Sequence, residues 1–178
     1  MIGLPSSGAH ANGYSLIRKI LQHCGQDPFQ ALPFAVDYDA KDDETPRLID
    51  WLMAPTRIYV KTIMSLLDKH RDKITALCHI TGGGFYENLP RVFNKSLCAR
   101  LNRDAFPHHP LFSWLQQAGN ISDFEMFRSF NCGIGMVILV KENDSHAIME
   151  SLRLLGEKPT IIGALHRQSK DKNTVVID

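Results

Sequence analysis

The sequence predicts an α/β sandwich in which helices pack against a mixed β-sheet. Short apolar runs with β-branched residues alternate along the chain with segments of helical periodicity. Glycines end several of these segments, and no internal repeat or low-complexity tract interrupts them. At 178 residues the chain fits one domain, and its hydrophobic core is large enough to fold without a disulfide or a metal.

Two helices are expected in the N-terminal part of the chain. The first covers residues 13–24, ends near Gly25 and has Asn12 as its candidate N-cap. The second covers residues 57–70, and residues 26–46 between the two helices are expected to form a loop. This loop carries acidic residues, which include Asp37, Asp39, Asp42, Asp43 and Glu44. A solvated loop is preferred over a metal site because nothing in the pattern anchors these carboxylates to one face.

The middle of the chain is expected to contain a buried strand followed by a helix. Residues 74–80 form an apolar run that three glycines end, and the helix begins near Phe85. Pro90 falls early enough to occupy the first turn of this helix or to mark a kink. Residues 97–102 alternate apolar and polar side chains, which also predicts a strand.

The C-terminal part supplies the remaining elements. Ser122 and Glu125 have the spacing of a capping box, in which both side chains satisfy free N–H groups at a helix start. Residues 134–140 are the clearest buried strand because they are apolar and rich in β-branched residues. The other expected elements are helices over residues 111–119 and 145–155 and strands over residues 160–165 and 174–177.

Residues 79–91 (HITGGGFYENLPR) are the most informative segment for function. Three adjacent glycines precede a helix, and this suits an anion because glycine permits a close approach and the helix start offers free N–H groups. A tight turn selected for packing is the alternative. A purely geometric turn has no need of the polar residues that crowd this segment, which are His79, Thr81, Glu87, Asn88 and Arg91. No Gly-Lys-Ser/Thr follows, so the segment is not a Walker A loop.

A second polar loop, residues 6–13 (SSGAHANG), leads directly into the first expected helix. It offers hydroxyl groups, an imidazole and a helix N-terminus, so it could hold an anion as well. An N-cap at Asn12 and a sharp turn at Gly8 would explain the same residues structurally.

Four segments carry a family resemblance, in the order SSGAHANGYSL (6–16), LMAPTRIYVK (52–61), the glycine segment 79–91 and FNCGIGM (130–136). Together they resemble the aminoimidazole ribonucleotide synthetase family, the phosphoribosylformylglycinamidine cyclo-ligases of purine biosynthesis. The resemblance extends from about Leu4 to the C-terminus but covers only the family's C-terminal domain. Residues 1–178 are therefore expected to be a single substrate-binding domain, without the family's N-terminal ATP-binding domain.

The resemblance implies an ATP-dependent ring closure. In this reaction the formyl amide oxygen of formylglycinamidine ribonucleotide is activated by phosphoryl transfer, and an amidine nitrogen attacks to give aminoimidazole ribonucleotide. ATP and Mg²⁺ belong to the N-terminal domain, which also builds the family homodimer. No cofactor is therefore expected on this chain, and the isolated domain is expected to be inactive.

Candidate site residues come from the two loops. His10 and His79 are the candidate catalytic residues, because imidazole titrates near neutral pH and could relay a proton or orient the amidine. A core histidine bonded to the backbone is the alternative for His79, and a surface ion pair is the alternative for Arg91. The candidate substrate-binding residues, which offer groups to a phosphate, a ribose or an amide, are Ser6, Ser7, Asn12, Thr81, Gly82, Gly83, Gly84, Glu87, Asn88 and Arg91.

Composition argues against several partners and compartments. The formal net charge is 20 − 19 = +1 without a strong basic block, so neither nucleic acid nor a membrane is expected as a partner. No signal peptide or transmembrane span is expected. The four cysteines are dispersed without a Cys-x-x-Cys, which favours a reduced, cytoplasmic setting. No metal site is expected, because Cys78-His79 and His108-His109 lack a spaced partner pair.

Two other functions remain open. The chain could belong to another enzyme of the same superfamily, such as formylglycinamidine ribonucleotide synthetase, thiamine-monophosphate kinase or selenophosphate synthetase, which share the architecture but differ in loop sequence. Alternatively it could be a noncatalytic phosphate-ligand-binding or assembly domain, because half an active site can retain affinity without turnover.

Overall fold

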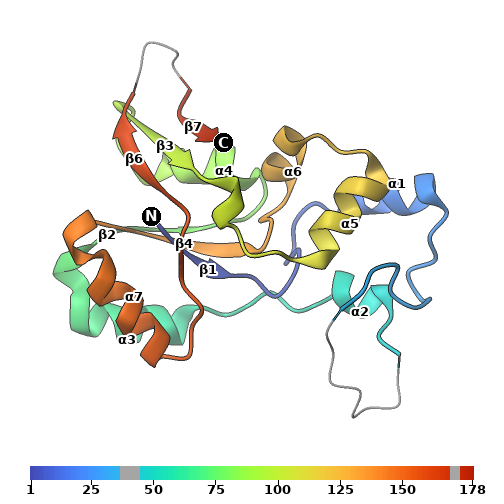
Figure 1. Cartoon of the computed structure of the whole chain (residues 1–178), viewed down its shortest axis with the longest axis horizontal. Coiled ribbons are helices and arrows are strands. Elements are labelled where there is room, and N and C mark those ends of the chain that lie inside the picture. The colour runs from blue at the N-terminus through green and yellow to red at the C-terminus, as the bar shows by residue number, and fades with distance from the viewer. Residues whose placement is uncertain (37–44, 169–172) are drawn as a thin grey trace.

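The computed structural model describes residues 1–36, 45–168 and 173–178. Two β-sheets and a set of short helices make up this part of the chain (Figure 1). The expected mixed α/β class is therefore confirmed. The predicted acidic cluster, from Asp37 to Glu44, lies outside the described residues.

The first sheet has four antiparallel strands in the order β2-β4-β1-β5. Their bounds are β1 Ile2–Pro5, β2 Ile74–His79, β4 Ile134–Val140 and β5 Thr160–Ile161. β4 is the longest strand and has a neighbour on each side. Its Val137 and Leu139 pack into one core and Ile138 into another, because successive side chains of a strand point to opposite faces. This is why residues 134–140 form an unbroken apolar run.

The second sheet has three strands in the order β6-β3-β7. Their bounds are β3 Leu97–Leu101, β6 Gly163–Arg167 and β7 Val175–Ile177. β3 pairs antiparallel with β6 and parallel with β7, so this sheet is mixed. The prediction of one strand over residues 160–165 was wrong, since the chain leaves the first sheet after Ile161 and enters the second at Gly163. A Cβ on Gly163 would overlap the Arg100 carbonyl oxygen, which explains the glycine at this crossing.

Seven α-helices and four short 3₁₀ helices are present in the described residues. The α-helices are α1 Tyr14–Cys24, α2 Leu48–Leu52, α3 Val60–His70, α4 Gly84–Asn88, α5 Pro110–Gly119, α6 Asp123–Ser129 and α7 Ser145–Leu154. The 3₁₀ helices are η1 Arg71–Lys73, η2 Leu89–Arg91, η3 Arg103–Ala105 and η4 Glu142–Asp144. The predicted helix near Phe85 is short, and Pro90 lies in η2 behind it.

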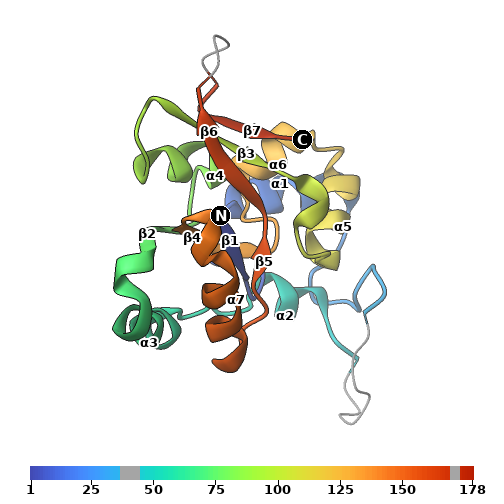
Figure 2. The same ribbon diagram turned by 60° about the vertical axis from the view of Figure 1, so that its left-hand side comes forward.

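The helices and sheets enclose three apolar cores. One lies between the two sheets and includes α4, and another lies between the first sheet and the pair α3 and α7. Figures 1 and 2 both show α3 and α7 side by side, on the opposite side of the first sheet from the second sheet. The third core joins α1, α2 and α5 at the end of the molecule to which β1 leads.

Some local predictions were wrong for identifiable reasons. The N-cap of α1 is Gly13 in a left-handed conformation (φ 74°) rather than Asn12. Ser122 does cap α6 by accepting from the Glu125 N–H, but the Glu125 carboxylate binds Arg128 and Ser129 instead of completing a capping box. Strand β2 is at the sheet edge and is mostly half-buried, so the prediction of a fully buried strand was also wrong.

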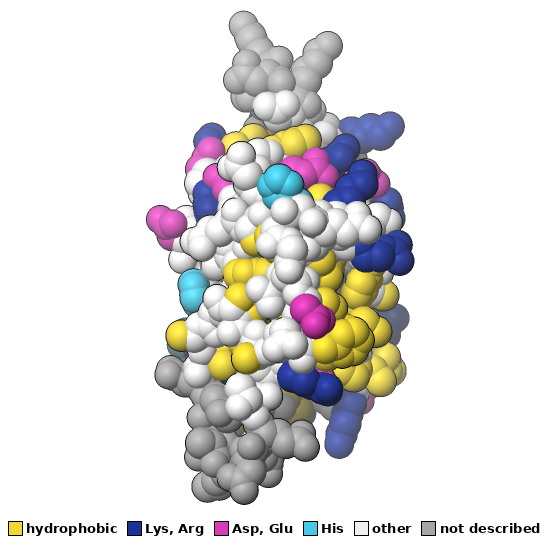
Figure 3. All heavy atoms as spheres, turned by 90° about the vertical axis from the view of Figure 1, so that its right-hand side faces the viewer, with side chains coloured by type: hydrophobic (Ala, Val, Ile, Leu, Met, Phe, Trp, Pro, Cys, Tyr) yellow, Lys and Arg dark blue, Asp and Glu magenta, His cyan; other side chains and the backbone are white. Residues whose placement is uncertain are grey.

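The surface carries no large block of one charge on the face that Figure 3 shows. Side chains of both charge signs are interspersed with apolar ones there, in keeping with the formal net charge of +1. Among the described residues, no helix is long and apolar enough to cross a membrane.

Candidate functional site

The two predicted loops leave the same end of the first sheet. β1 and β2 both run antiparallel to β4, so they run in the same direction and their carboxyl ends meet the start of β4. Pro5 pairs with Ile134 and His79 pairs with Met136. The 6–13 loop, the glycine segment and the 130–133 turn therefore converge at one edge, as ligand-binding loops commonly do at strand ends.

The 6–13 loop is fixed by the turn before β4. The Asn131 side chain is fully buried, donates to the Gly8 carbonyl oxygen (2.8 Å) and accepts from the Ser6 hydroxyl (2.9 Å) and the Gly133 N–H (3.0 Å). The Ser7 hydroxyl donates to the Pro55 carbonyl oxygen (2.6 Å). Both serine hydroxyl hydrogens are thus used inside the protein and are not offered to a ligand in this arrangement.

The glycine segment is braced in a similar way by Asn88. This buried side chain donates to the carbonyl oxygens of Thr81, Gly82 and Gly84 and accepts from the Thr81 hydroxyl. Gly84 is also structural: its N–H donates to the Thr81 carbonyl oxygen, and a Cβ there would overlap the Phe127 carbonyl oxygen of α6. Thr81, Gly84 and Asn88 therefore build the loop.

The remaining predicted residues leave donors available at the junction of the loops. No described residue accepts a hydrogen bond from the main-chain N–H groups of Gly82 or Gly83 or from the side-chain amide of Asn12, whereas the Asn12 main-chain N–H donates to the Ala9 carbonyl oxygen (3.3 Å). The two loops are close together here, since a Cβ on Gly82 would lie 4.0 Å from Asn12 Oδ1. The Glu87 carboxylate covers Gly83 and lies 3.8 Å from Arg91, with both side chains mostly exposed.

The two candidate catalytic histidines are neighbours. The ring centres of His10 and His79 are 6.2 Å apart, and Tyr59 lies about equally far from both, at 6.3 Å and 5.9 Å. His79 is exposed, so the alternative of a core histidine is not what the structure shows. His10 is 3% exposed and has a left-handed backbone (φ 56°). A Cβ on Gly135 would overlap the Tyr59 hydroxyl and lie 2.6 Å from His10 Cε1, so the packing of these rings requires glycine at this position of β4.

Burial sets the protonation states of His10 and Tyr59. Desolvation, with smaller contributions from His79 and Arg57, lowers the pKa of His10 to about 4. The ring is therefore neutral at physiological pH. Desolvation also raises the pKa of Tyr59, whose hydroxyl donates to the Pro5 carbonyl oxygen (2.8 Å), so Tyr59 is a neutral donor.

The predicted site residues did not include four that organise this edge, namely Arg57, Tyr59, Asn131 and Glu157. Three of them lie in the segments 52–61 and 130–136 that carry the family resemblance, so the signal for them was present. Glu157 had none, since it is a single acidic residue after a helix. It is nevertheless buried and accepts from Arg57 (2.7 Å) and Thr62 (2.8 Å).

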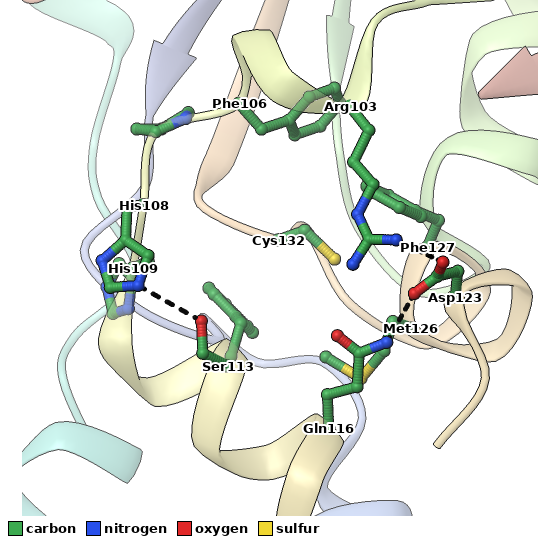
Figure 4. A pocket seen from close by; sticks show the side chains of 12 residues that line it. Arg103, Phe106, His108, His109, Ser113, Gln116, Asp123, Met126, Phe127 and Cys132 are labelled. Carbon is green, nitrogen blue, oxygen red and sulfur yellow. Dashed lines mark hydrogen bonds and ion pairs between the residues drawn. The ribbon is translucent and has the colours of Figure 1, made fainter. Parts of the chain in front are cut away.

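Two cavities adjoin the converging segments. One, of about 410 Å³, has mainly apolar walls from Ile58, Val60, Ile63 and Met64 and reaches His79. The other, of about 210 Å³, lies behind Cys132 between η3, α5 and α6. Figure 4 shows Arg103, Asp123 and Gln116 at its edge, and none of the predicted site residues lines it.

The described residues do not fit a metal centre. They contain no group of three or more His, Cys, Asp or Glu side chains placed to hold an ion. Magnesium prefers carboxylate and phosphate oxygens in octahedral geometry, and the carboxylates of Glu87 and Glu157 are each paired with an arginine.

Comparisons with known proteins find relatives that match nearly the whole of this chain. The phosphoribosylformylglycinamidine cyclo-ligase of Bordetella pertussis is 45% identical over 178 residues, which are 99% of this chain and 48% of that protein. The enzyme of the same name from Bordetella avium is 46% identical over 165 residues, 93% of this chain and 44% of that protein. The chain thus spans about half the length of the curated relatives it matches.

A solved structure shares the fold. Thiamine-monophosphate kinase from Stenotrophomonas maltophilia superposes with a TM-score of 0.56 over 99% of this chain and 50% of that chain. Its 16% sequence identity makes this a likeness of fold alone. The family described as "AIR synthase related protein, C-terminal domain" matches residues 1–175. The chain belongs to this family.

Proposed function

We propose that this chain is the substrate-binding half of a phosphoribosylformylglycinamidine cyclo-ligase. In this proposal it binds formylglycinamidine ribonucleotide and takes part in its ATP-dependent closure to aminoimidazole ribonucleotide in the cytoplasm. The cyclo-ligases of Bordetella support the proposal by their identity over nearly the whole chain. ATP, Mg²⁺ and the dimer contact would belong to the other half of such an enzyme, so the isolated chain would bind substrate without turning it over.

The observation that carries the proposal is the set of unused donors where the two loops meet. The main-chain N–H groups of Gly82 and Gly83 and the side-chain amide of Asn12 have no acceptor among the described residues, and the Asn12 side chain lies beside Gly82. A phosphate accepts several such bonds, and main-chain donors without side chains let it approach closely. Glu87 would repel a phosphate placed over Gly83, so we place the phosphate toward Gly82 and Asn12 and a ribose hydroxyl at Glu87.

The reaction depends on positioning more than on a protein nucleophile. Phosphoryl transfer to the formyl amide oxygen creates a leaving group, and closure then requires the amidine nitrogen near that carbon. Holding the ribose phosphate at one end of the substrate fixes the other end relative to His10, His79 and Tyr59. The free donors, the two imidazoles and the braced loops are the parts that such positioning requires.

Calorimetric titration tests the proposal with one variant and a matched control. Gly83→Val should reduce the affinity for formylglycinamidine ribonucleotide at least tenfold, because the side chain displaces Glu87 and blocks the loop. Gly25→Val is the control, since Gly25 also has a positive φ but has no neighbour within 4 Å of its Cβ position. Circular dichroism checks that both variants fold. Equal affinities of Gly83→Val and the unmodified chain would contradict the anion-loop assignment.

A further inference from the structure

The His10 ring is held by two main-chain donors on the same nitrogen. Nε2 lies 3.2 Å from the Ser7 nitrogen and 3.4 Å from the Arg57 nitrogen, and both N–H groups point to it. An imidazole nitrogen that accepts hydrogen bonds carries no proton, so the proton of this neutral ring is on Nδ1. Geometry therefore selects one of the two tautomers.

The protonated nitrogen has no partner. Within the described residues, His10 Nδ1 is buried and makes no hydrogen bond. Buried polar groups are nearly always hydrogen-bonded, and an orphaned donor marks a strained or a ligand-binding position. The left-handed backbone of His10 is a second feature of note, since few residues other than glycine adopt a positive φ, although asparagine, aspartate and histidine do so most often. Both features occur at the edge where the loops converge.

Arg57, one of the two donors to Nε2, is anchored by a buried carboxylate. Its guanidinium lies 2.7 Å from Glu157 Oε2 and donates to the Pro5 carbonyl oxygen (3.1 Å) at the end of β1. Glu157, whose side chain is 4% exposed, also accepts from the Thr62 hydroxyl of α3. The Glu157 side chain is held rigidly by these bonds. If the bond to Arg57 broke, the buried carboxylate would lose its counter-charge, which is energetically costly. Glu157 therefore ties the segment after α7 to Arg57 and α3, and Arg57 continues this connection to β1.

We propose that Glu157, acting through Arg57, is a positioning residue that fixes His10 with its proton on Nδ1, and that this N–H donates a hydrogen bond to an oxygen of the bound ligand. The ligand oxygen belongs to a phosphoryl or a carbonyl group, both of which accept in the same way. Only this second part rests on the proposed function. The role differs from the proton relay expected for His10, because a fixed neutral donor stabilises charge on an oxygen without changing its own protonation.

Nitrogen-15 NMR of the imidazole rings tests the first part on the unliganded chain. We expect His10 Nδ1 to give the shift of a protonated nitrogen and Nε2 that of an unprotonated one between pH 6 and 8. Glu157→Gln should introduce an Nε2-protonated population, because Arg57 loses its anchor. Glu150→Gln on the exposed side of α7 should leave the ring unchanged.

Two results would overturn the positioning role. One is an Nε2-protonated His10 in the unmodified chain, and the other is an unchanged ring in Glu157→Gln. If Glu157→Gln does not fold, Thr62→Val replaces it, because this change removes one hydrogen bond of Glu157 and keeps the ion pair. The expected change in the tautomer population is then smaller and in the same direction.

Titration with formylglycinamidine ribonucleotide and, for comparison, with ribose 5-phosphate tests the second part. The Nδ1 resonance should move when formylglycinamidine ribonucleotide binds, and His10→Ala should weaken the binding of this ligand about tenfold or more, as expected for a hydrogen bond to a charged acceptor. His10→Asn should retain most of the affinity, since asparagine tolerates the left-handed backbone and places an amide near the position of Nδ1. Binding that leaves the Nδ1 resonance unmoved refutes the donor role and spares the proposed function, whereas failure of both ligands to bind counts against both.

Discussion

Residues of the same type differ in role at this site, depending on whether their hydrogen-bond donors already have a protein acceptor. Ser6, Ser7 and Thr81 donate their hydroxyl hydrogens to protein acceptors and so build the loops. The Asn88 side chain builds one loop, whereas the Asn12 side-chain amide has no hydrogen-bond partner among the described residues. The residues placed to contact a ligand are therefore fewer than the polar residues in the two loops.

Folding stability should depend on pH through His10. Its pKa is lowered to about 4, whereas an unfolded histidine titrates near 6.5, so between these values the unfolded chain binds a proton that the folded chain does not. The free energy of unfolding should therefore decrease as the pH falls from about 6.5 to about 4. Burial lowers the pKa of His109 as well, which adds a contribution of the same sign.

Urea denaturation at a series of pH values measures this dependence. We expect His10→Asn to reduce the slope of the free energy of unfolding against pH between pH 6.5 and 4. The smaller slope that remains should come from His109. His23→Asn, which changes an exposed histidine of α1, should reproduce the curve of the unmodified chain. Parallel curves for the unmodified chain and His10→Asn would show that the folded His10 ring is not held neutral.

At the scale of elements, the site depends on contacts between segments far apart in the sequence. Asn131 joins the turn before β4 to the loop after β1, and Glu157 joins the segment after α7 to α3. These contacts place the ends of β1 and β2 beside each other. The loops converge because β4 separates the two strands and runs opposite to both.

Removing the Asn131 side chain should destabilise the fold markedly. Asn131→Ala leaves the Gly8 carbonyl oxygen, the Gly133 N–H and the Ser6 hydroxyl without their partner, and a buried unsatisfied group costs about 1–3 kcal/mol. We expect a loss of at least about 2 kcal/mol in the free energy of unfolding, measured by urea titration. Asn143→Ala, on the exposed surface of η4, should change it by less than about 0.5 kcal/mol. Equal effects of the two changes would mean that the hydrogen bonds of Asn131 contribute little to the free energy of unfolding.

Much of the element order followed from local pattern. The apolar run 134–140 predicted β4, and the helical periodicity of residues 13–24 predicted α1. Both predictions depend only on the spacing of apolar residues that are close together in the sequence. The break of the expected strand 160–165 at Gly163 was missed, since it depends on the approach of Arg100 from another strand. The role of Glu157 was missed for the same reason, because its partners lie about 100 residues away.

At the scale of the whole molecule, the central question is how this chain would work together with the part of the full-length relatives that it does not cover. The chain covers 48% of the Bordetella pertussis cyclo-ligase and belongs to a C-terminal domain family. Among the described residues, the main-chain N–H groups of Gly82 and Gly83 at the loop junction have no protein acceptor. Our proposal is that such a domain binds substrate and depends on a second domain for phosphoryl transfer.

Reconstitution tests that claim most directly. The purified chain would be assayed for aminoimidazole ribonucleotide formation with formylglycinamidine ribonucleotide and ATP, first alone and then with the separately made remaining half of the Bordetella pertussis enzyme. We predict no turnover by the chain alone and measurable turnover in the mixture, because phosphoryl transfer needs nucleotide, metal and acceptor positioned together. Turnover of roughly 1 s⁻¹ or more by the chain alone would contradict the account.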